Sequence, residues 1–359
     1  MRQFLMQDRS LAGFDSLEGN ADVSSIAQTD QKNMPREAIS ARTHLGWIDL
    51  VRAVACILVV LLHASGPFIE GANPLSYAST AGLGEAASRC SVPLFFMIIG
   101  YLAFEQNRSS SGQNLGRKIA RGVIPLVVYT VAYAALCWAE GLDIKNPLQE
   151  PVFYHLWFLY CYPINAVLLS FARPPNINPL IGTLVCGASI ILIAEIFRSL
   201  TQNHVALLVS QQISFYLFSA FGFYVWSVRP SRALAVLCVL LYCAATFLTA
   251  YLTAYFSARA GTLDQTFYQY DMPLIVVQAA ALGYVLKNYG IWVSGLELVK
   301  YLSAVSLGIY CIHPLILLIS MQYFGNSTES YYICIVLSLS FSWLAASFIR
   351  SLPGGKWLA

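Results

Sequence analysis

The chain has 359 residues, of which 57% are hydrophobic and only 11% charged, and its mean hydropathy is +0.61. A soluble domain has roughly a quarter of its residues charged, so too few charges remain here to cover a water-facing surface, and composition alone predicts a polytopic membrane protein. The net charge of +3 is too small to indicate nucleic-acid binding, and the nine cysteines form no CxxC pair, so we expect neither a zinc site nor a redox motif.

The chain divides by composition into three parts. Residues 1–45 are polar and lack periodicity, which predicts a disordered tail, and no apolar run of the signal-peptide kind precedes the first span. A transmembrane domain follows over 46–351, and a short segment closes the chain over 352–359. With about 20 residues per helix as the ruler, an all-α fold with about ten transmembrane helices is predicted, at 47–68, 88–104, 119–139, 154–171, 179–197, 211–228, 233–256, 272–288, 302–322 and 331–350.

The basic residues predict the orientation of these spans. If the N-terminus is cytoplasmic, the tail and the cytoplasmic loops hold sixteen of the 21 Lys and Arg residues. The opposite side then holds Arg89, Lys145, Arg198 and Arg259, and the remaining residue, Arg52, lies within the first span. Because cytoplasmic loops carry an excess of Lys and Arg, both termini are predicted to be cytoplasmic.

The first span, GWIDLVRAVACILVVLLHASGPF (46–68), carries three ionisable residues. Arg52 and His63 are eleven positions apart, so at ~100° and ~1.5 Å per residue they share one helix face and lie about 16 Å apart along the axis. Asp49 is three residues before Arg52 and can pair with it. A charge in hydrocarbon costs at least ~2.5 kcal/mol, so such groups usually face a cavity or a partner.

Two interpretations of this span stay open. In one, Asp49 and Arg52 form an interfacial ion pair and His63 is a hydrogen-bonded packing residue. In the other, they belong to a polar track with an anion-binding end inside and an acid–base end outside, because arginine binds phosphates bidentately and histidine exchanges protons near neutral pH. The loop sequence GRKIAR (116–121) fits the orientation rule alone, and binding of a phosphorylated donor is its second interpretation.

Further polar residues converge on the outer side by topology. Arg89, His155 and Asp271 open the second, fourth and eighth spans. Each taken alone is better explained by contact with lipid headgroups, whereas together with His63 they favour an outward polar site. His313 falls near the middle of the ninth span, before Pro314, which removes a backbone N–H and bends the helix. His313 has two explanations: it belongs to the polar site, or it makes a buried hydrogen bond that links two helices.

Four phrases then occur in a fixed order: WIDLVRAVACILVVLLH, SVPLFFMIIGYL, FYHLWFLY and SLGIYCIHP. Over about 47–350, the sequence resembles the acyltransferase-3 family of integral membrane acyltransferases, whose first helix carries an arginine and a histidine separated by ten residues. Where that family often has FFxxSG, this chain has Ile99 in place of the serine. Walker, GxSxG, HExxH and dinucleotide motifs do not occur.

The resemblance implies a function. Acetyl-CoA is expected as the cytoplasmic donor, without a metal, and a sugar hydroxyl of a periplasmic or lipid-linked glycan as the acceptor, with the protein in the bacterial inner membrane among its lipids. Arg52 and His63 correspond to the family's functional pair, with His63 as either a general base or a transient acetyl carrier. Donor or acceptor binding is predicted for Asp49, Arg89, His155, Asp271 and His313.

A transporter or flippase of a lipid-linked glycan is the alternative, since it also needs a polar track. Such folds often show paired, interrupted helices in matching halves, and the sequence shows no such symmetry.

Overall fold

The computed structural model describes residues 36–70, 79–109, 115–141, 143–147, 150–200, 204–290, 293, 295–325 and 327–359. These residues form α-helices and short 3-10 helices with no strand among them, which confirms the all-α prediction. Of the predicted tail, residues 1–35 lie outside the described part, and helix α2 begins at Arg36. The features discussed below belong to the compact unit Leu45–Ala359.

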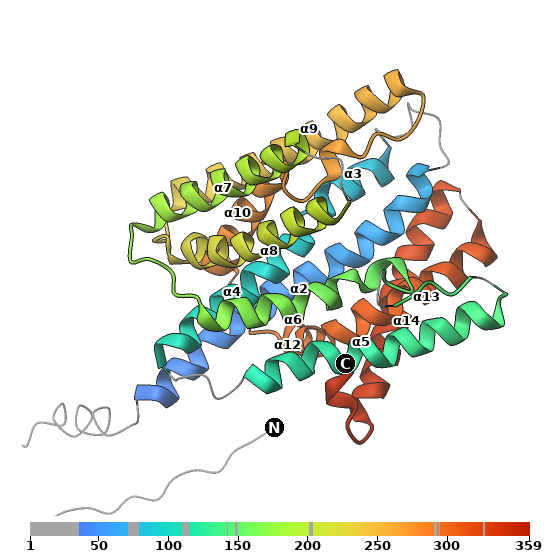
Figure 1. The fold of residues 1–359 in the computed structure, drawn as a ribbon, viewed down its shortest axis with the longest axis horizontal. Helices are drawn as coiled ribbons and strands as arrows, with labels where there is room; N and C mark the ends of the chain where they lie inside the picture. The colour runs from blue at the N-terminus through green and yellow to red at the C-terminus, as the bar shows by residue number, and fades with distance from the viewer. Residues whose placement is uncertain are drawn as a thin grey trace, which may run out of the picture. The chain divides into compact units, whose positions relative to one another are not determined.

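Each predicted span overlaps one long helix (Figure 1). The long helices are α2 (Arg36–Glu70), α4 (Ser91–Ser109), α5 (Leu115–Ala139), α6 (Trp157–Phe171), α7 (Pro179–Leu200), α8 (His204–Ser227), α9 (Arg232–Ala260), α10 (Pro273–Tyr289), α13 (Ser306–Phe324) and α14 (Thr328–Ser351). The short elements are α3 (Thr80–Ser88), α12 (Glu297–Ala304), and the 3-10 helices η2 (Tyr154–Leu156), η3 (Thr266–Tyr268) and η4 (Gly355–Trp357).

The sequence sets several helix ends by capping chemistry. Ser231 caps α9, its hydroxyl accepting a bond from the N–H of Leu234, and Ser327 caps α14 in the same way. At its other end, α9 stops at Gly261, whose φ of 72° lies in the left-handed region that glycine adopts without strain. Helix α10 starts with Pro273, which has no N–H to lose there.

Seven helices in the described part of the chain are long and apolar enough to cross a membrane. They are Gly46–Ile69, Thr80–Glu105, Leu115–Ala139, Pro179–Leu200, Arg232–Ala260, Ser306–Phe324 and Thr328–Ser351. Helices α6 and α10, with 15 and 17 residues, are shorter than the ~20 residues of an upright span. The chain is a polytopic membrane protein; the count of ten spans and the cytoplasmic position of both termini stay predictions.

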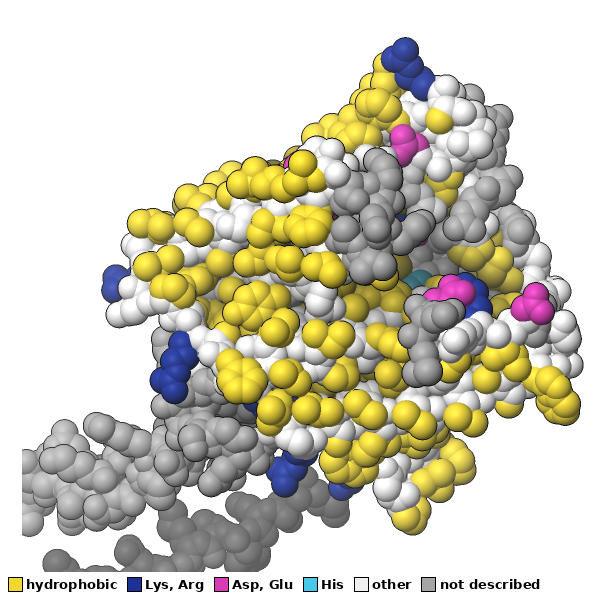
Figure 2. All heavy atoms as spheres, in the orientation of Figure 1, with side chains coloured by type: hydrophobic (Ala, Val, Ile, Leu, Met, Phe, Trp, Pro, Cys, Tyr) yellow, Lys and Arg dark blue, Asp and Glu magenta, His cyan; other side chains and the backbone are white. Residues whose placement is uncertain are grey.

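The surface agrees with a lipid environment. In Figure 2 hydrophobic side chains cover much of the face shown; most charged side chains lie near its margins, and one charged group lies farther in, on the right. Many large apolar residues are more than half exposed, which a soluble protein avoids in such number. They include Leu184, Leu192, Val236, Leu240, Phe247 and Phe348.

The largest cluster of buried hydrophobic residues joins α2, α4, α8 and α10. Helices α4 and α8 pack closely because Gly100 and Gly222 lie at their crossing. A Cβ on Gly100 would strike the backbone of Ser219, and one on Gly222 would strike Met97. Small residues at a crossing let membrane helices approach each other, so the glycine retained from the family's FFxxSG phrase has a packing role here.

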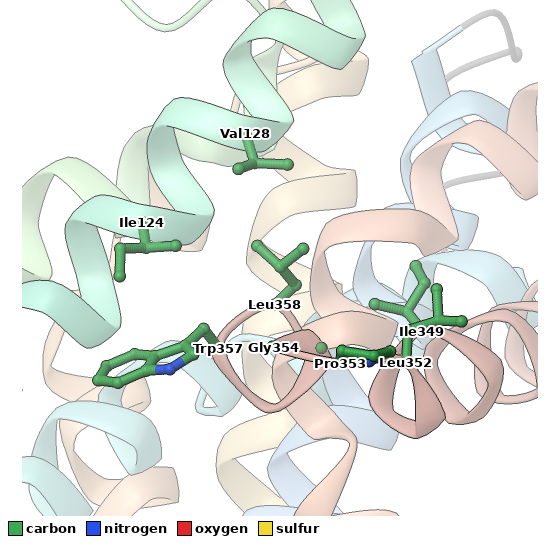
Figure 3. Close-up of a pocket in the computed structure, with 9 residues that line it drawn as sticks. Ile124, Val128, Ile349, Leu352, Pro353, Gly354, Trp357 and Leu358 are labelled. Carbon is green, nitrogen blue, oxygen red and sulfur yellow. The ribbon is translucent and has the colours of Figure 1, made fainter.

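The last eight residues fold back against α5 and α14. Arg350 donates from Nη1 to the backbone oxygens of Ala304 (2.8 Å) and Ala359 (2.9 Å), and the Tyr129 hydroxyl donates to the oxygen of Leu358 (3.2 Å). A cavity of about 270 Å³ lies between this segment and α5, where Ile124 and Val128 line it (Figure 3). The described residues that line it are apolar or glycine.

Candidate active site

Two histidines from distant parts of the chain form a pair. Nδ1 of His63, on α2, lies 2.8 Å from Nε2 of His313, on α13, which is a hydrogen-bond distance. The two rings are stacked, with centroids 5.0 Å apart. The sequence predicted both residues for the site, and the structure places them in direct contact although 250 positions separate them.

The hydrogen-bond pattern assigns the protons of this pair. Nδ1 of His313 lies 3.0 Å from the carbonyl oxygen of Ile309. A carbonyl can only accept, so this Nδ1 carries the proton, and Nε2 of a neutral His313 carries the lone pair. Nδ1 of His63 is therefore the donor to His313. The lone pair of His63 is then at Nε2, which makes this atom the basic end of the pair.

His155 lies beside the pair, in η2. Its ring centroid is 6.0 Å from that of His313 and 6.5 Å from that of His63. The ring is fully buried, between Tyr133 and Tyr310, and neither of its nitrogens makes a close hydrogen bond in the described part of the structure, although the backbone of Cys311 lies nearby. A buried imidazole without a close partner costs stability.

A cavity of about 500 Å³ opens next to His63. Its size lies in the range of small-molecule sites, roughly 300–1,000 Å³. His63 lines this cavity and His313 does not, so the basic member of the pair is the one that faces the space. The described residues that line it are Leu62, His63, Gly66, Pro67, Ile69, Glu85, Arg89, Tyr154, Leu263, Gln265, Tyr268, Tyr270, Pro314, Leu317, Leu318 and Met321.

An ion pair forms the polar wall of the cavity. Arg89, the residue that ends α3, pairs with Glu85 one turn earlier, and the two side chains are only 15% and 5% exposed. The guanidinium carbon of Arg89 lies 4.5 Å from the ring centroid of Tyr268, a cation–π distance. Burial raises the pKa of the Tyr268 phenol, so the hydroxyl stays neutral at physiological pH. The structure thus places the predicted Arg89 in the same cavity as His63.

Glu85, Tyr268 and Tyr270 were not predicted for the site. The phrase GEAASR holds a signal for the first of them, because Glu85 and Arg89 are four positions apart and face each other if the segment is helical. The predicted second span began only at 88, since the small residues of α3 (TAGLGEAAS) give a weak hydropathy signal. The two tyrosines lie in the segment before α10, where only the charged Asp271 was singled out from the sequence.

Asp49 and Arg52 form a second cluster, nearer the start of α2. Arg52 Nη1 lies 3.6 Å from Oδ1 of Asp49 and donates to the hydroxyl of Ser303 (3.1 Å), which donates to the same Asp49 oxygen (2.7 Å). Arg121, on α5, and Tyr162, on α6, lie within electrostatic range of Arg52. Arg52 and Arg121, within electrostatic range of each other, form a cationic cluster. The helical rise places it about 16 Å from the histidine pair.

Asp271 has a different setting from the other predicted residues. Its Oδ1 accepts a bond of 2.8 Å from Arg198, which also pairs with Glu195 at 2.9 Å. Asp271 does not line the cavity, although its neighbour Tyr270 does. The structure therefore places Asp271 in an ion pair that ties α7 to the segment before α10.

One comparison with known proteins identifies a family. A family model described as an acyltransferase domain matches residues 45–347, a range that includes every predicted site residue from Asp49 to His313. No curated protein and no solved structure matches the chain. Within the described residues, no group of three or more His, Cys, Asp or Glu side chains is arranged to hold a metal ion.

Proposed function

The chain belongs to the acyltransferase-3 family of membrane acyltransferases, and from that premise we propose that it is an O-acetyltransferase of the bacterial inner membrane. It takes the acetyl group of cytoplasmic acetyl-CoA and transfers it to a sugar hydroxyl of a cell-surface polysaccharide or its lipid-linked precursor. The phrases RCSVPLFFMIIGYL and EPVFYHLWF resemble the O-acetyltransferase of enterobacterial common antigen, which supports both the acetyl donor and the glycan acceptor.

The observation that carries this proposal is that His63, whose Nδ1 is bonded to His313 and whose Nε2 is thereby assigned the lone pair, lines a ligand-sized cavity. As a general base, Nε2 takes the proton of the sugar hydroxyl while the oxygen attacks the thioester carbonyl. The C–O bond forms, the C–S bond breaks, and the leaving thiolate takes the proton from His63. While His63 is positively charged, its Nδ1–H bond to His313 becomes charge-assisted and stronger, which favours the transition state over the ground state.

The same geometry supports an acetyl-carrier route. Nε2 of His63 then attacks the thioester itself, the C–S bond breaks, and CoA leaves as a thiolate. In a second step the sugar hydroxyl attacks the acetyl-imidazolium, the C–O bond forms, the C–N bond to His63 breaks, and the hydroxyl proton is released to the thiolate or to water. The two routes differ in one measurable way. A carrier releases up to one equivalent of free CoA per protein before any acceptor is added, whereas a general base releases none.

The cluster around Asp49 and Arg52 has the charge needed to bind the acetyl-CoA donor. The guanidinium groups of Arg52 and Arg121 match the phosphates of CoA, because arginine binds phosphate oxygens bidentately. Arg52 and His63 lie on one helix, about 16 Å apart along its axis. The extended pantetheine arm of the donor has to cover that distance for its thioester to reach His63.

The experiment is the mass of the surface polysaccharide repeat unit from cells that carry wild type, Arg52→Ala or His63→Ala, at matched membrane levels. Lys300→Ala is the control, because Lys300 is a half-exposed cation paired with the exposed Glu297 on α12. The proposal expects an acetyl increment with wild type and the control and none with the two site variants. An unchanged repeat mass in all four, with altered glycan export, would identify a transporter instead.

A further inference from the structure

The cavity beside His63 has a charge balance that restricts its ligand. Among its described lining residues, the permanently charged groups are Glu85 and Arg89, and these two neutralise each other. A carboxylate or phosphate entering the cavity would lose water and meet a guanidinium that is already paired, with a carboxylate next to it. Desolvating an anion without a free cation is costly. The charge balance therefore favours a neutral ligand.

The same wall can still bind hydroxyl groups. A guanidinium has five N–H donors in a fixed plane, which is more than a single carboxylate occupies. Arg89 is held in place by the Glu85 pair and by the ring of Tyr268. A rigid planar donor beside a carboxylate can donate to one hydroxyl oxygen while the carboxylate accepts from another hydroxyl. Adjacent hydroxyls of a sugar ring present this combination of groups.

An aromatic ring also lies beside His63. Tyr154 lines the cavity, and its ring centroid is 5.4 Å from that of His63 at an interplanar angle of 66°. Tyr154 is 53% exposed, whereas Tyr268 is 2% exposed and has Arg89 over its face, and Tyr270 is half-buried. Tyr154 is therefore the most exposed of the three cavity tyrosines, and it lies beside His63.

We propose that this cavity is the acceptor subsite and that it selects a neutral pyranose. The apolar C–H face of the sugar packs on Tyr154, the reacting hydroxyl lies at His63 Nε2, and adjacent hydroxyls bind the Glu85–Arg89 pair. This inference rests on the proposed function, which supplies the reaction. It adds the class of sugar and the residues that select it.

The test uses purified full-length protein in nanodiscs with labelled acetyl-CoA. The acceptor probes are methyl hexopyranosides and the corresponding methyl hexuronosides, which differ by one carboxylate. Tyr154→Ala is expected to raise the KM for the hexopyranoside about tenfold, with the KM for acetyl-CoA within about twofold, and Tyr154→Phe to behave like wild type. Tyr332→Ala is the matched control: Tyr332, on α14, is 50% exposed and does not line the cavity.

Glu85→Gln tests the charge argument separately. With Arg89 no longer neutralised, the ratio of hexuronoside to hexopyranoside transfer should rise about tenfold, as expected for one gained ion pair of roughly 1.4 kcal/mol. Three results would overturn this inference and leave the proposed function standing. Wild type could prefer the hexuronoside, or it could acetylate neither probe while it still modifies the cellular glycan. The third such result is an acceptor KM that Tyr154→Ala does not change. A wild type that acetylates neither the probes nor the cellular glycan would overturn the proposed function itself.

Discussion

The bond between His63 and His313 gives the account its sharpest mutational prediction. His313→Phe keeps a ring of similar size and removes the acceptor for Nδ1–H of His63, whereas His313→Gln keeps an acceptor where Nε2 was. A bond to a charged group is worth about 1.5–3 kcal/mol and a neutral one about 0.5–1.5. The difference, roughly 1–2 kcal/mol, is gained only when His63 is protonated in the transition state. At 1.36 kcal/mol per factor of ten, kcat should fall about 5- to 30-fold in His313→Phe.

The assay is acetyl transfer by purified protein, with kcat and both KM values determined per folded molecule. Because His313 is fully buried, thermal unfolding in detergent is measured for each variant to separate lost catalysis from lost folding. Both KM values should stay within about twofold, and His313→Gln should recover most of kcat. The reasoning is refuted if His313→Phe keeps wild-type kcat, or if His313→Gln loses as much as His313→Phe does.

Three further predictions follow from the other contacts. Arg52→Ala should raise the KM for acetyl-CoA about tenfold or more through the loss of a bidentate phosphate contact. Lys300→Ala, the control, should leave this KM unchanged. Equal KM values in the two variants would contradict the proposal that Arg52 binds the acetyl-CoA donor. Asp271→Asn should keep kcat/KM within about twofold. It should lower the free energy of unfolding by about 1 kcal/mol, since it weakens the partly exposed ion pair with Arg198. A large loss of activity would instead support the predicted role of Asp271 in donor or acceptor binding. Gly100→Ala should destabilise the protein by about 1–3 kcal/mol through overpacking against α8. The measurement is the unfolding temperature, which should fall. An unfolding temperature equal to that of wild type would show that α4 and α8 can separate at no cost.

The sequence predicted the helices well because their signal is local. Every predicted span overlaps a helix, since hydropathy is summed over consecutive residues. Errors occur where that sum is weak. Helix α3 was missed, and with it Glu85. Helices α6 and α10 are shorter than a full span, so they are identifiable from the sequence as helices but not as upright crossings.

The sequence identified candidate residues for the site, but not the contacts that these residues make with one another. His63, His313, His155 and Arg89 stood out as ionisable groups in apolar surroundings, and the structure brings them to one place. The direction of the hydrogen bond between the two histidines depends on the carbonyl of Ile309, which periodicity cannot show.

Partners from distant segments could not be predicted. Ser303, between Arg52 and Asp49, is 254 positions away from Asp49, and nothing in its own neighbourhood marks it. Asp271 shows the reverse case. Its position at the start of a span suggested a site, and the structure pairs it with Arg198 from another helix.

The most direct test of the central claim is acetyl transfer by the purified protein in nanodiscs, with labelled acetyl-CoA and glycan extracted from cells that lack this protein. The account predicts that wild type moves the label to the glycan and releases one free CoA per acetyl transferred, and that His63→Ala, equally folded, moves none. Transfer by His63→Ala at the wild-type rate, or label that never leaves acetyl-CoA with wild type, would contradict it.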